Sequence, residues 1–145
     1  MELSNKSEYA ILALLELATC YSRGEPLQIR EIAALQHIPN RYLEQLLATL
    51  RRRGLIKSIR GAKGGYVLAR EPRRITLLDA LNCMEGLDTD VSNLEQNPQT
   101  LDGDVIQDVW QEARQAANAV LQKYTLQDLC ERRASKERKE LMYYI

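Results

Sequence analysis

The chain has 145 residues, of which 45% are hydrophobic and 28% are charged, a composition typical of one globular domain with room for an appended helical arm. No apolar run approaches the roughly 20 residues that a membrane-spanning helix needs. The N-terminus lacks a basic region followed by an apolar core, which argues against a secretory signal. We therefore expect a cytoplasmic protein with no membrane partner. The three cysteines are too few and too scattered for a disulfide framework; they are Cys20, Cys83 and Cys130.

The net charge of zero hides an uneven distribution. Residues 51–74 contain nine Lys or Arg and a single acid, whereas residues 79–112 contain nine acids and no Lys or Arg. A basic block on one module is the electrostatic signature of a polyanion partner. The alternative interpretation is a solvated surface with scattered charges.

Residues 5–22 form the first predicted helix, because apolar residues recur there at helical spacing. Ser4 or Asn5 can cap its start. Gly24 lies just beyond the periodic pattern and is expected to end it.

Two more helices are predicted over residues 29–36 and 40–53, joined by a tight connection. Pro39 in that connection cannot continue the earlier helix but is well placed to open the next one. Gly54 is expected to end the third helix. Four leucines form the inward stripe of this helix: Leu43, Leu46, Leu47 and Leu50.

Two short strands are predicted over residues 55–59 and 66–70, with the glycine-rich turn RGAKGG between them. A phosphate-binding loop would need the pattern G-x-x-x-x-G-K-[ST] between a strand and a helix. Here the turn joins two strands, and Lys63 precedes Gly64. Helix, tight turn, helix and hairpin together predict a winged helix-turn-helix.

Beyond the hairpin, a helix with the sequence LLDALNCME is predicted, capped by Thr76 with Asp79. Residues 87–103 are polar and are expected to form an exposed loop.

A long helix is predicted over residues 104–124, with an apolar stripe wider than one short domain could cover. The stripe favours a partner surface, and folding back onto its own domain is the alternative. Thr125 with Asp128 is expected to restart a short helix, followed by a charged tail.

The chain resembles the Rrf2 family of bacterial winged-helix transcription regulators in the strings LSNKSEYAILALLELA and IREIAALQHIPNRYLEQLLATLRRRGLIKSIRGAKGGYVLAREPRRITLLDAL and in the long helix that follows. The resemblance implies a mainly α fold with a small β-hairpin, a winged helix-turn-helix with a long dimerisation helix, and a homodimer to which the first helix contributes. It divides the chain into a winged helix-turn-helix domain (1–75), a linker helix with an exposed effector-type loop (76–103), a dimerisation helix region (104–134) and a C-terminal tail (135–145).

Such a regulator binds double-stranded DNA through the N-terminal residues of its recognition helix. Arg41 and Gln45 lie four residues apart and share a face, and these residue types can hold guanine and adenine edges. The resemblance implies that Arg60 enters the minor groove. The predicted DNA contacts are Asn40, Arg41, Tyr42, Gln45, Arg52, Arg60, Gly61, Lys63, Gly64 and Gly65. The alternative is a protein-interaction regulator that keeps the fold but does not bind DNA.

The signal sensed is left open by the sequence. In the resembled family, cluster-binding members carry three closely spaced cysteines in the loop before the long helix, but residues 86–104 here contain none. We therefore expect no cofactor, although a [2Fe–2S] cluster with unusual ligands, Glu8 and Cys83 among the candidates, stays possible. The other options are a cluster-free regulator controlled by a protein or small molecule and a redox-active cysteine. With His37 as the single histidine, no catalytic motif and no metal site, we expect no enzyme.

Overall fold

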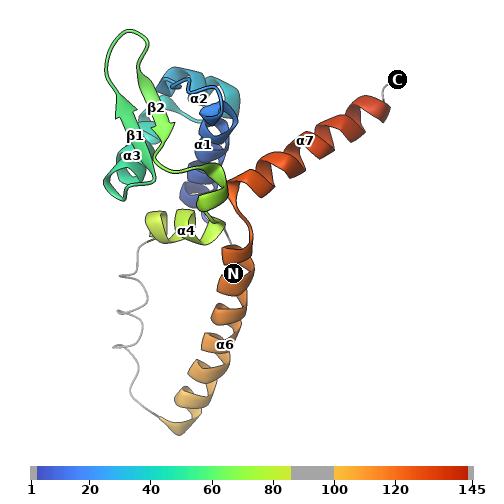
Figure 1. Cartoon of the computed structure of the whole chain (residues 1–145). Helices are drawn as coiled ribbons and strands as arrows, with labels where there is room; N and C mark the ends of the chain where they lie inside the picture. The colour runs from blue at the N-terminus through green and yellow to red at the C-terminus, as the bar shows by residue number, and fades with distance from the viewer. Residues whose placement is uncertain (1–2, 86–99, 144–145) are drawn as a thin grey trace.

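The computed structural model describes residues 3–85 and 100–143. A three-helix module carries a two-stranded hairpin, and two long helices leave it in different directions (Figure 1). In chain order the elements are α1 (Asn5–Tyr21), α2 (Ile29–Gln36), α3 (Asn40–Arg52), β1 (Ile56–Ile59), β2 (Gly65–Leu68), the 3-10 helix η1 (Pro72–Arg74), α4 (Leu77–Glu85), α6 (Leu101–Lys123) and α7 (Leu126–Tyr143). The predicted mainly α winged helix-turn-helix is confirmed.

Local sequence signals start and stop the first helices much as predicted. Ser4 is the residue that caps α1, because its side chain accepts a hydrogen bond from the Ser7 N–H at 3.2 Å. Gly54 follows α3 with a φ of 84°, a left-handed conformation that suits glycine. At that end the Leu55 N–H reaches the Leu50 carbonyl at 3.0 Å and the Gly54 N–H reaches the Arg51 carbonyl at 3.1 Å, which is a Schellman motif.

The core lies where α1, α3, α4 and the hairpin meet. The four predicted leucines of α3 are each 2% exposed or less, so the inward stripe is confirmed. They pack in one cluster with apolar residues of α1 and with Ile56 and Leu68 of the hairpin. Burying a leucine side chain stabilises the fold by about 1.5–3 kcal/mol, so this stripe holds α3 firmly against the module.

The hairpin is antiparallel, with Ile56 paired to Leu68 and Ile59 paired to Gly65. A third segment joins it, because Leu27 forms a bridge with Tyr66. The Leu27 N–H donates to the Tyr66 carbonyl at 3.0 Å, and the Tyr66 N–H donates to the Leu27 carbonyl at 2.8 Å. The hairpin is therefore joined to the chain just before α2.

Two predictions about the second half of the chain are wrong. The exposed loop expected up to residue 103 ends earlier, because α6 begins at Leu101. Thr100 caps α6 by accepting a hydrogen bond from the Gly103 N–H at 3.1 Å. The part of the expected loop in residues 87–99 lies outside the described residues.

The helix after Thr125 is not short, since α7 runs to Tyr143 through the segment expected to be a charged tail. That segment is rich in Glu, Lys, Arg, Leu and Met, which have high helix propensity. The distal half of α7 points away from the body (Figure 1). No helix within residues 3–85 and 100–143 is long and apolar enough to cross a membrane.

Candidate nucleic-acid interface

The N-terminal face of α3 is exposed where DNA contacts are predicted. Asn40, Arg41 and Gln45 are exposed, whereas Leu43 on the opposite face is 0% exposed. Because Arg41 and Gln45 are one turn apart, both side chains leave the same side of the helix. Pro39 stands at the N-cap and supplies no capping side chain, so the positive end of the α3 dipole is open to an anion.

Tyr42, also predicted to contact DNA, has a second role in the structure. Its side chain is half-buried and its ring meets that of Tyr9 on α1 edge to face, with centroids 5.6 Å apart and an interplanar angle of 81°. Such a contact is worth about 0.5–1.5 kcal/mol beyond area burial. Tyr42 therefore ties the start of the recognition helix to α1.

The turn between α2 and α3 depends on His37. This residue has a φ of 56° and is the one non-glycine residue with positive φ in the described part of the chain. The next residue, Ile38, is 3% exposed and donates its N–H to the Ala33 carbonyl at 3.1 Å. His37 is itself exposed, so it serves the turn through its backbone.

The tip of the wing presents two cations on a backbone shaped by glycines. Arg60 and Lys63 are exposed, and Gly61 has a φ of 112° with nothing within 4 Å of an added Cβ. Gly64 differs, because it is buried and an added Cβ would collide with the Ile59 carbonyl oxygen. At Gly65 an added Cβ would lie 2.5 Å from the Leu27 carbonyl oxygen. Gly64 and Gly65 thus shape the wing, whatever contact they make with DNA.

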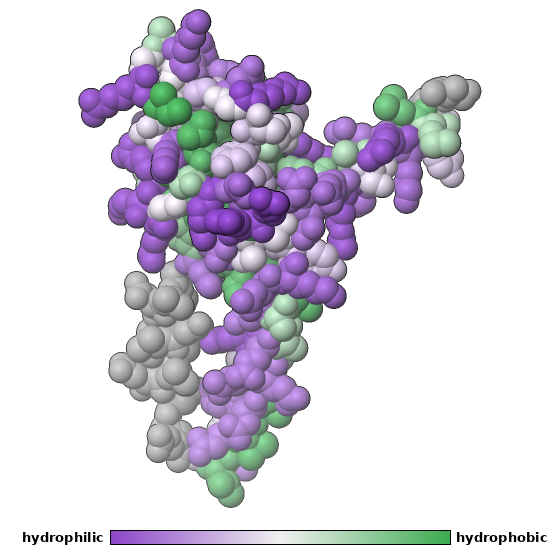
Figure 2. Space-filling view, viewed as in Figure 1, coloured by the Kyte–Doolittle hydropathy of each residue, from purple (hydrophilic) through white to green (hydrophobic). Residues whose placement is uncertain are grey.

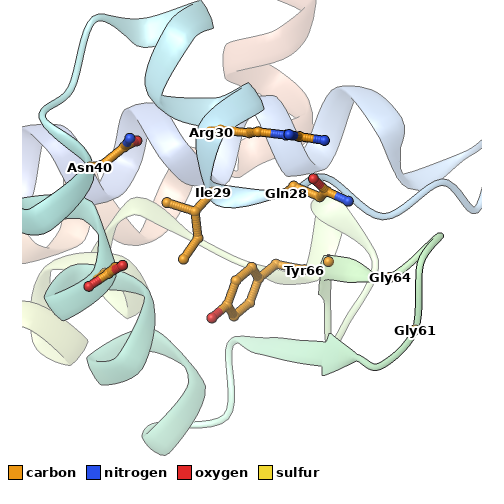
Figure 3. Close-up of a pocket in the computed structure, with 9 residues that line it drawn as sticks. Gln28, Ile29, Arg30, Asn40, Gly61, Gly64 and Tyr66 are labelled. Atoms are coloured by element: carbon orange, nitrogen blue, oxygen red, sulfur yellow. The ribbon is translucent and has the colours of Figure 1, made fainter.

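An open groove of about 430 Å³ lies between α2, α3 and the wing (Figure 3). Tyr66 and Ile29 project into it, and Gln28 and Arg30 lie along its α2 side. Tyr66 packs under the wing, since its half-buried side chain contacts the core cluster.

Sequence reasoning missed Gln28, Arg30 and Glu44, which line this groove beside Asn40. No sequence signal marks the first two, because their place beside the wing depends on the pairing of Leu27 with Tyr66. Glu44 is exposed on α3, and a carboxylate there can accept a hydrogen bond from a cytosine amine.

Three cations of the basic block at residues 51–74 lie close to acidic side chains in the folded chain. Arg73 and Arg74 lie 2.7 and 3.9 Å from the Glu71 carboxylate, and the hydrogen bond and charge of Arg73 lower the pKa of Glu71. Arg70 lies 3.9 Å from Asp79. Within residues 51–74, the cations for which no ion pair is found lie at the wing and the C-terminal end of α3: Arg51, Arg52, Arg53, Lys57, Arg60 and Lys63.

The thiols are not arranged for metal binding in the part of the chain that the structure describes. All three are free, and no group of three His, Cys, Asp or Glu residues there could hold a metal ion. Burial raises the pKa of Cys20, Cys83 and Cys130, which favours the neutral thiol over the thiolate that iron needs. Glu8 is exposed on α1. Within residues 3–85 and 100–143, these thiols and Glu8 therefore do not form a donor cluster.

A helix-turn-helix whose recognition helix is open at its N-terminus, followed by a hairpin with a cationic tip, defines a winged-helix DNA-binding module. The chain belongs to the Rrf2 family, described as iron-dependent transcriptional regulators, whose sequence model matches residues 3–132. It is a DNA-binding transcriptional regulator, not an enzyme.

The similarity to the following relatives covers most or all of the chain. It is 37% identical over 145 residues to the transcriptional regulator CymR of Bacillus subtilis, covering 100% of both chains. It is 38% identical to the putative regulator slr0846 of Synechocystis, covering 89% of this chain and 87% of that one. Among solved structures, IscR of T. potens has a TM-score of 0.75 at 35% identity, covering 90% of this chain and 87% of that one. CymR of B. subtilis has a TM-score of 0.74 at 34% identity, covering 90% and 97%.

Proposed function

We propose that this regulator binds a specific operator as a homodimer, with α3 in the major groove and the wing in the adjoining minor groove. The observation that carries the proposal is the pairing of Leu27 with Tyr66. This pairing joins the wing to the helix-turn-helix, so that Arg60 and Arg41 are presented by one rigid unit. Arginine at the wing suits a narrow A·T-rich minor groove, whose negative potential attracts it.

The exposed apolar face of α6 supports the homodimer. None of the 23 residues of α6 is buried, and Val105, Val109 and Trp110 are 59%, 62% and 58% exposed. The stripe therefore does not fold back onto its own domain, and apolar side chains are visible along α6 (Figure 2). An exposed apolar surface of this kind marks a protein interface.

Charge along α6 favours an antiparallel arrangement of two copies. Acidic residues occupy its N-terminal half, at Asp102, Asp104, Asp108 and Glu112, while Arg114 and Lys123 lie in its C-terminal half. In an antiparallel pair, the acidic half of each helix faces the basic half of the other. The two helix dipoles also point in opposite directions, which is favourable. A twofold dimer would then place two recognition helices on half-sites about 34–36 Å apart.

The regulator is proposed to work without an iron–sulfur cluster and to respond to a partner protein or a small molecule. The thiol chemistry described above supports this, because the three cysteines are separated and hold their protons. A redox-active cysteine is less favoured for the same reason, since the thiolate is the reactive form. Anaerobic purification with iron and sulfide quantified per chain is the check, and stoichiometric iron with sulfide would overturn this part.

DNA binding is tested by selecting sequences from a randomised duplex pool and titrating the selected duplex by fluorescence anisotropy at several salt concentrations. The logarithm of the association constant should fall with the logarithm of the salt concentration by about 0.9 for each phosphate contacted. The selected duplex should bind at least about 10³-fold more tightly than a scrambled one. Equal, weak binding of both duplexes would instead support a protein-interaction regulator that does not bind DNA.

The dimer is tested by sedimentation equilibrium of wild type and of Val109→Glu, which puts a charge in the centre of the apolar stripe. The variant should dissociate, and its circular dichroism should stay unchanged because Val109 is exposed in the single chain. Gln111→Glu, on the opposite face of α6, is the matched control and should remain dimeric. A wild type that is monomeric at high concentration would overturn the dimer.

A further inference from the structure

A cavity lies on the side of the module where α7 packs against α1. Its volume is about 530 Å³, within the range of roughly 300–1,000 Å³ found for small-molecule sites. Small apolar residues of α1, η1 and α7 form part of its wall. Its polar lining is made by Thr19, Tyr21, Ser22, Gln127, Cys130, Arg133 and Glu137. None of these residues belongs to the DNA-binding face or to the apolar stripe of α6.

Arg133 forms the charged wall of this cavity and is held in place from one side. Its Nη1 donates to Glu16 Oε1 at 3.3 Å, and its Nη2 donates to the Thr19 hydroxyl. The Arg133 side chain is 33% exposed, whereas that of Glu16 is 13% exposed. Because a guanidinium has five N–H donors, Arg133 keeps donors for a ligand in the cavity.

Glu137 places a negative charge close to the positive charge of Arg133. It follows Arg133 by one turn of α7, so the two side chains are neighbours on the same face, with Cβ atoms about 6 Å apart. Glu137 is exposed and forms no ion pair among the described residues. A cation and an anion one turn apart, with the Thr19 and Ser22 hydroxyls beside them, complement a small molecule that carries both charges.

We propose that this cavity binds a small zwitterion of the amino-acid class. Its carboxylate would be held by Arg133, a residue suited to bidentate recognition of carboxylates, and its ammonium group by Glu137. The Ser22 hydroxyl and the amide oxygen of Gln127 line the cavity and are available to a polar side chain of the ligand.

The same arginine connects the cavity with the helix-turn-helix. Glu16 also accepts a hydrogen bond from Gln36 Nε2 at 2.5 Å, and Gln36 is the last residue of α2, next to the turn at His37. A ligand carboxylate on the remaining donors of Arg133 places a second negative charge near Glu16, and so acts on the carboxylate to which Gln36 donates. This second step rests on the proposed function, because it matters only if α3 binds DNA; the binding of the zwitterion does not.

The test is isothermal titration of the full-length protein with each standard L-amino acid in turn, with acetate and methylammonium as single-charge probes. We expect at least one amino acid to bind with a dissociation constant below about 1 mM, and both single-charge probes to bind at least tenfold more weakly. Arg133→Lys keeps the positive charge beside Glu16 but removes the guanidinium that can bind a carboxylate through two N–H groups. Glu137→Gln removes the negative charge that would bind the ammonium group of the ligand. Each should weaken binding at least tenfold, whereas Lys139→Ala, at an exposed position of α7 outside the cavity, should not.

Circular dichroism of each variant shows whether weaker binding comes from the loss of the site or from unfolding. If Arg133→Lys unfolds, the binding of the amino acid by Glu137→Gln tests the proposal. The absence of binding by every amino acid at that affinity would overturn the proposal, as would binding that both variants retain. The coupling step is tested separately, by titrating operator DNA with and without the amino acid in wild type and in Glu16→Gln. A protein that binds the amino acid but no DNA would refute the proposed function and leave the site standing.

Discussion

The backbones of Thr76 and Thr125 pair in an isolated antiparallel bridge. The Leu77 N–H donates to the Tyr124 carbonyl, and the Leu126 N–H donates to the Ile75 carbonyl, both at 2.9 Å. The bridge joins the start of α4 to the start of α7. It thereby sets the direction in which α7 leaves the DNA-binding module (Figure 1).

Each of these threonines also opens its helix with the same capping box. The Asp79 N–H donates to the Thr76 hydroxyl and the Thr76 N–H donates to the Asp79 carboxylate, both at 3.0 Å. The Thr125 and Asp128 pair repeats this at 3.2 and 3.0 Å. Two capped helix starts therefore lie side by side and satisfy their backbone groups together.

Thr125→Ala should lower the free energy of unfolding by about 0.5–2 kcal/mol, since it removes the cap from α7. Thr125→Ser keeps the hydroxyl and should stay close to wild type. Urea denaturation followed by circular dichroism measures both. An Ala variant as stable as the Ser variant would show that the hydroxyl does not cap α7 in solution.

The two capping boxes could be predicted from the sequence, because each is a local pattern of four residues. Their pairing could not, because the bridge joins segments far apart in the chain and depends on how α4 and α7 each pack against α1. The same reason explains why the exposed position of Arg41 could be predicted and the position of Arg30 in the groove could not. Arg41 is placed by its own helix, whereas Arg30 reaches the groove only through the bridge between Leu27 and Tyr66.

Gly65→Ala should damage the wing more than Gly61→Ala does. Both glycines have positive φ, but only at Gly65 does an added Cβ also meet backbone, 2.5 Å from the Leu27 carbonyl oxygen. Backbone strain alone costs about 1–3 kcal/mol, and the collision at Gly65 adds the loss of the bridge to Tyr66. Urea denaturation should therefore rank Gly65→Ala below Gly61→Ala and both below wild type. Equal stability of the two variants would mean that the wing moves away from Leu27 at no cost.

Cys83 should react slowly with a thiol reagent at pH 8. Burial raises its pKa, with an opposing effect from the charge of Arg53, so its thiolate fraction is smaller than that of a free cysteine with a pKa of about 8.5. Unfolding in urea should bring it to the rate of a free thiol. Mass spectrometry of the labelled peptides follows each cysteine separately.

The raised pKa of Cys83 affects the free energy of unfolding only in alkaline solution. Below the pKa of the unfolded thiol both states keep the proton, and above it only the unfolded chain loses the proton, so stability falls as the pH rises. Wild type should therefore lose more stability than Cys83→Ala between about pH 8.5 and pH 10. Parallel pH profiles of the two proteins would contradict the raised pKa.

Arg41 and Arg60 should make different contributions to DNA binding, although both are exposed cations. In the proposed complex α3 presents Arg41 to base edges, so Arg41→Ala should cost about 1–3 kcal/mol on the selected operator and much less on a scrambled duplex. A uniform loss on both duplexes would make Arg41 a phosphate contact. Arg60→Ala should cost a similar amount on the operator, because one specific contact is lost at the wing.

The contribution of Arg60 should also depend on the sequence beneath the wing. Replacing A·T pairs there by G·C pairs widens the minor groove and weakens its negative potential, so the operator change should reduce wild-type affinity but have little further effect on Arg60→Ala. Lys139→Ala, on α7 and far from the wing, controls for loss of a positive charge alone. Affinity of Arg60→Ala equal to wild type, measured by anisotropy at the same salt concentration, would rule out a minor-groove contact by the wing.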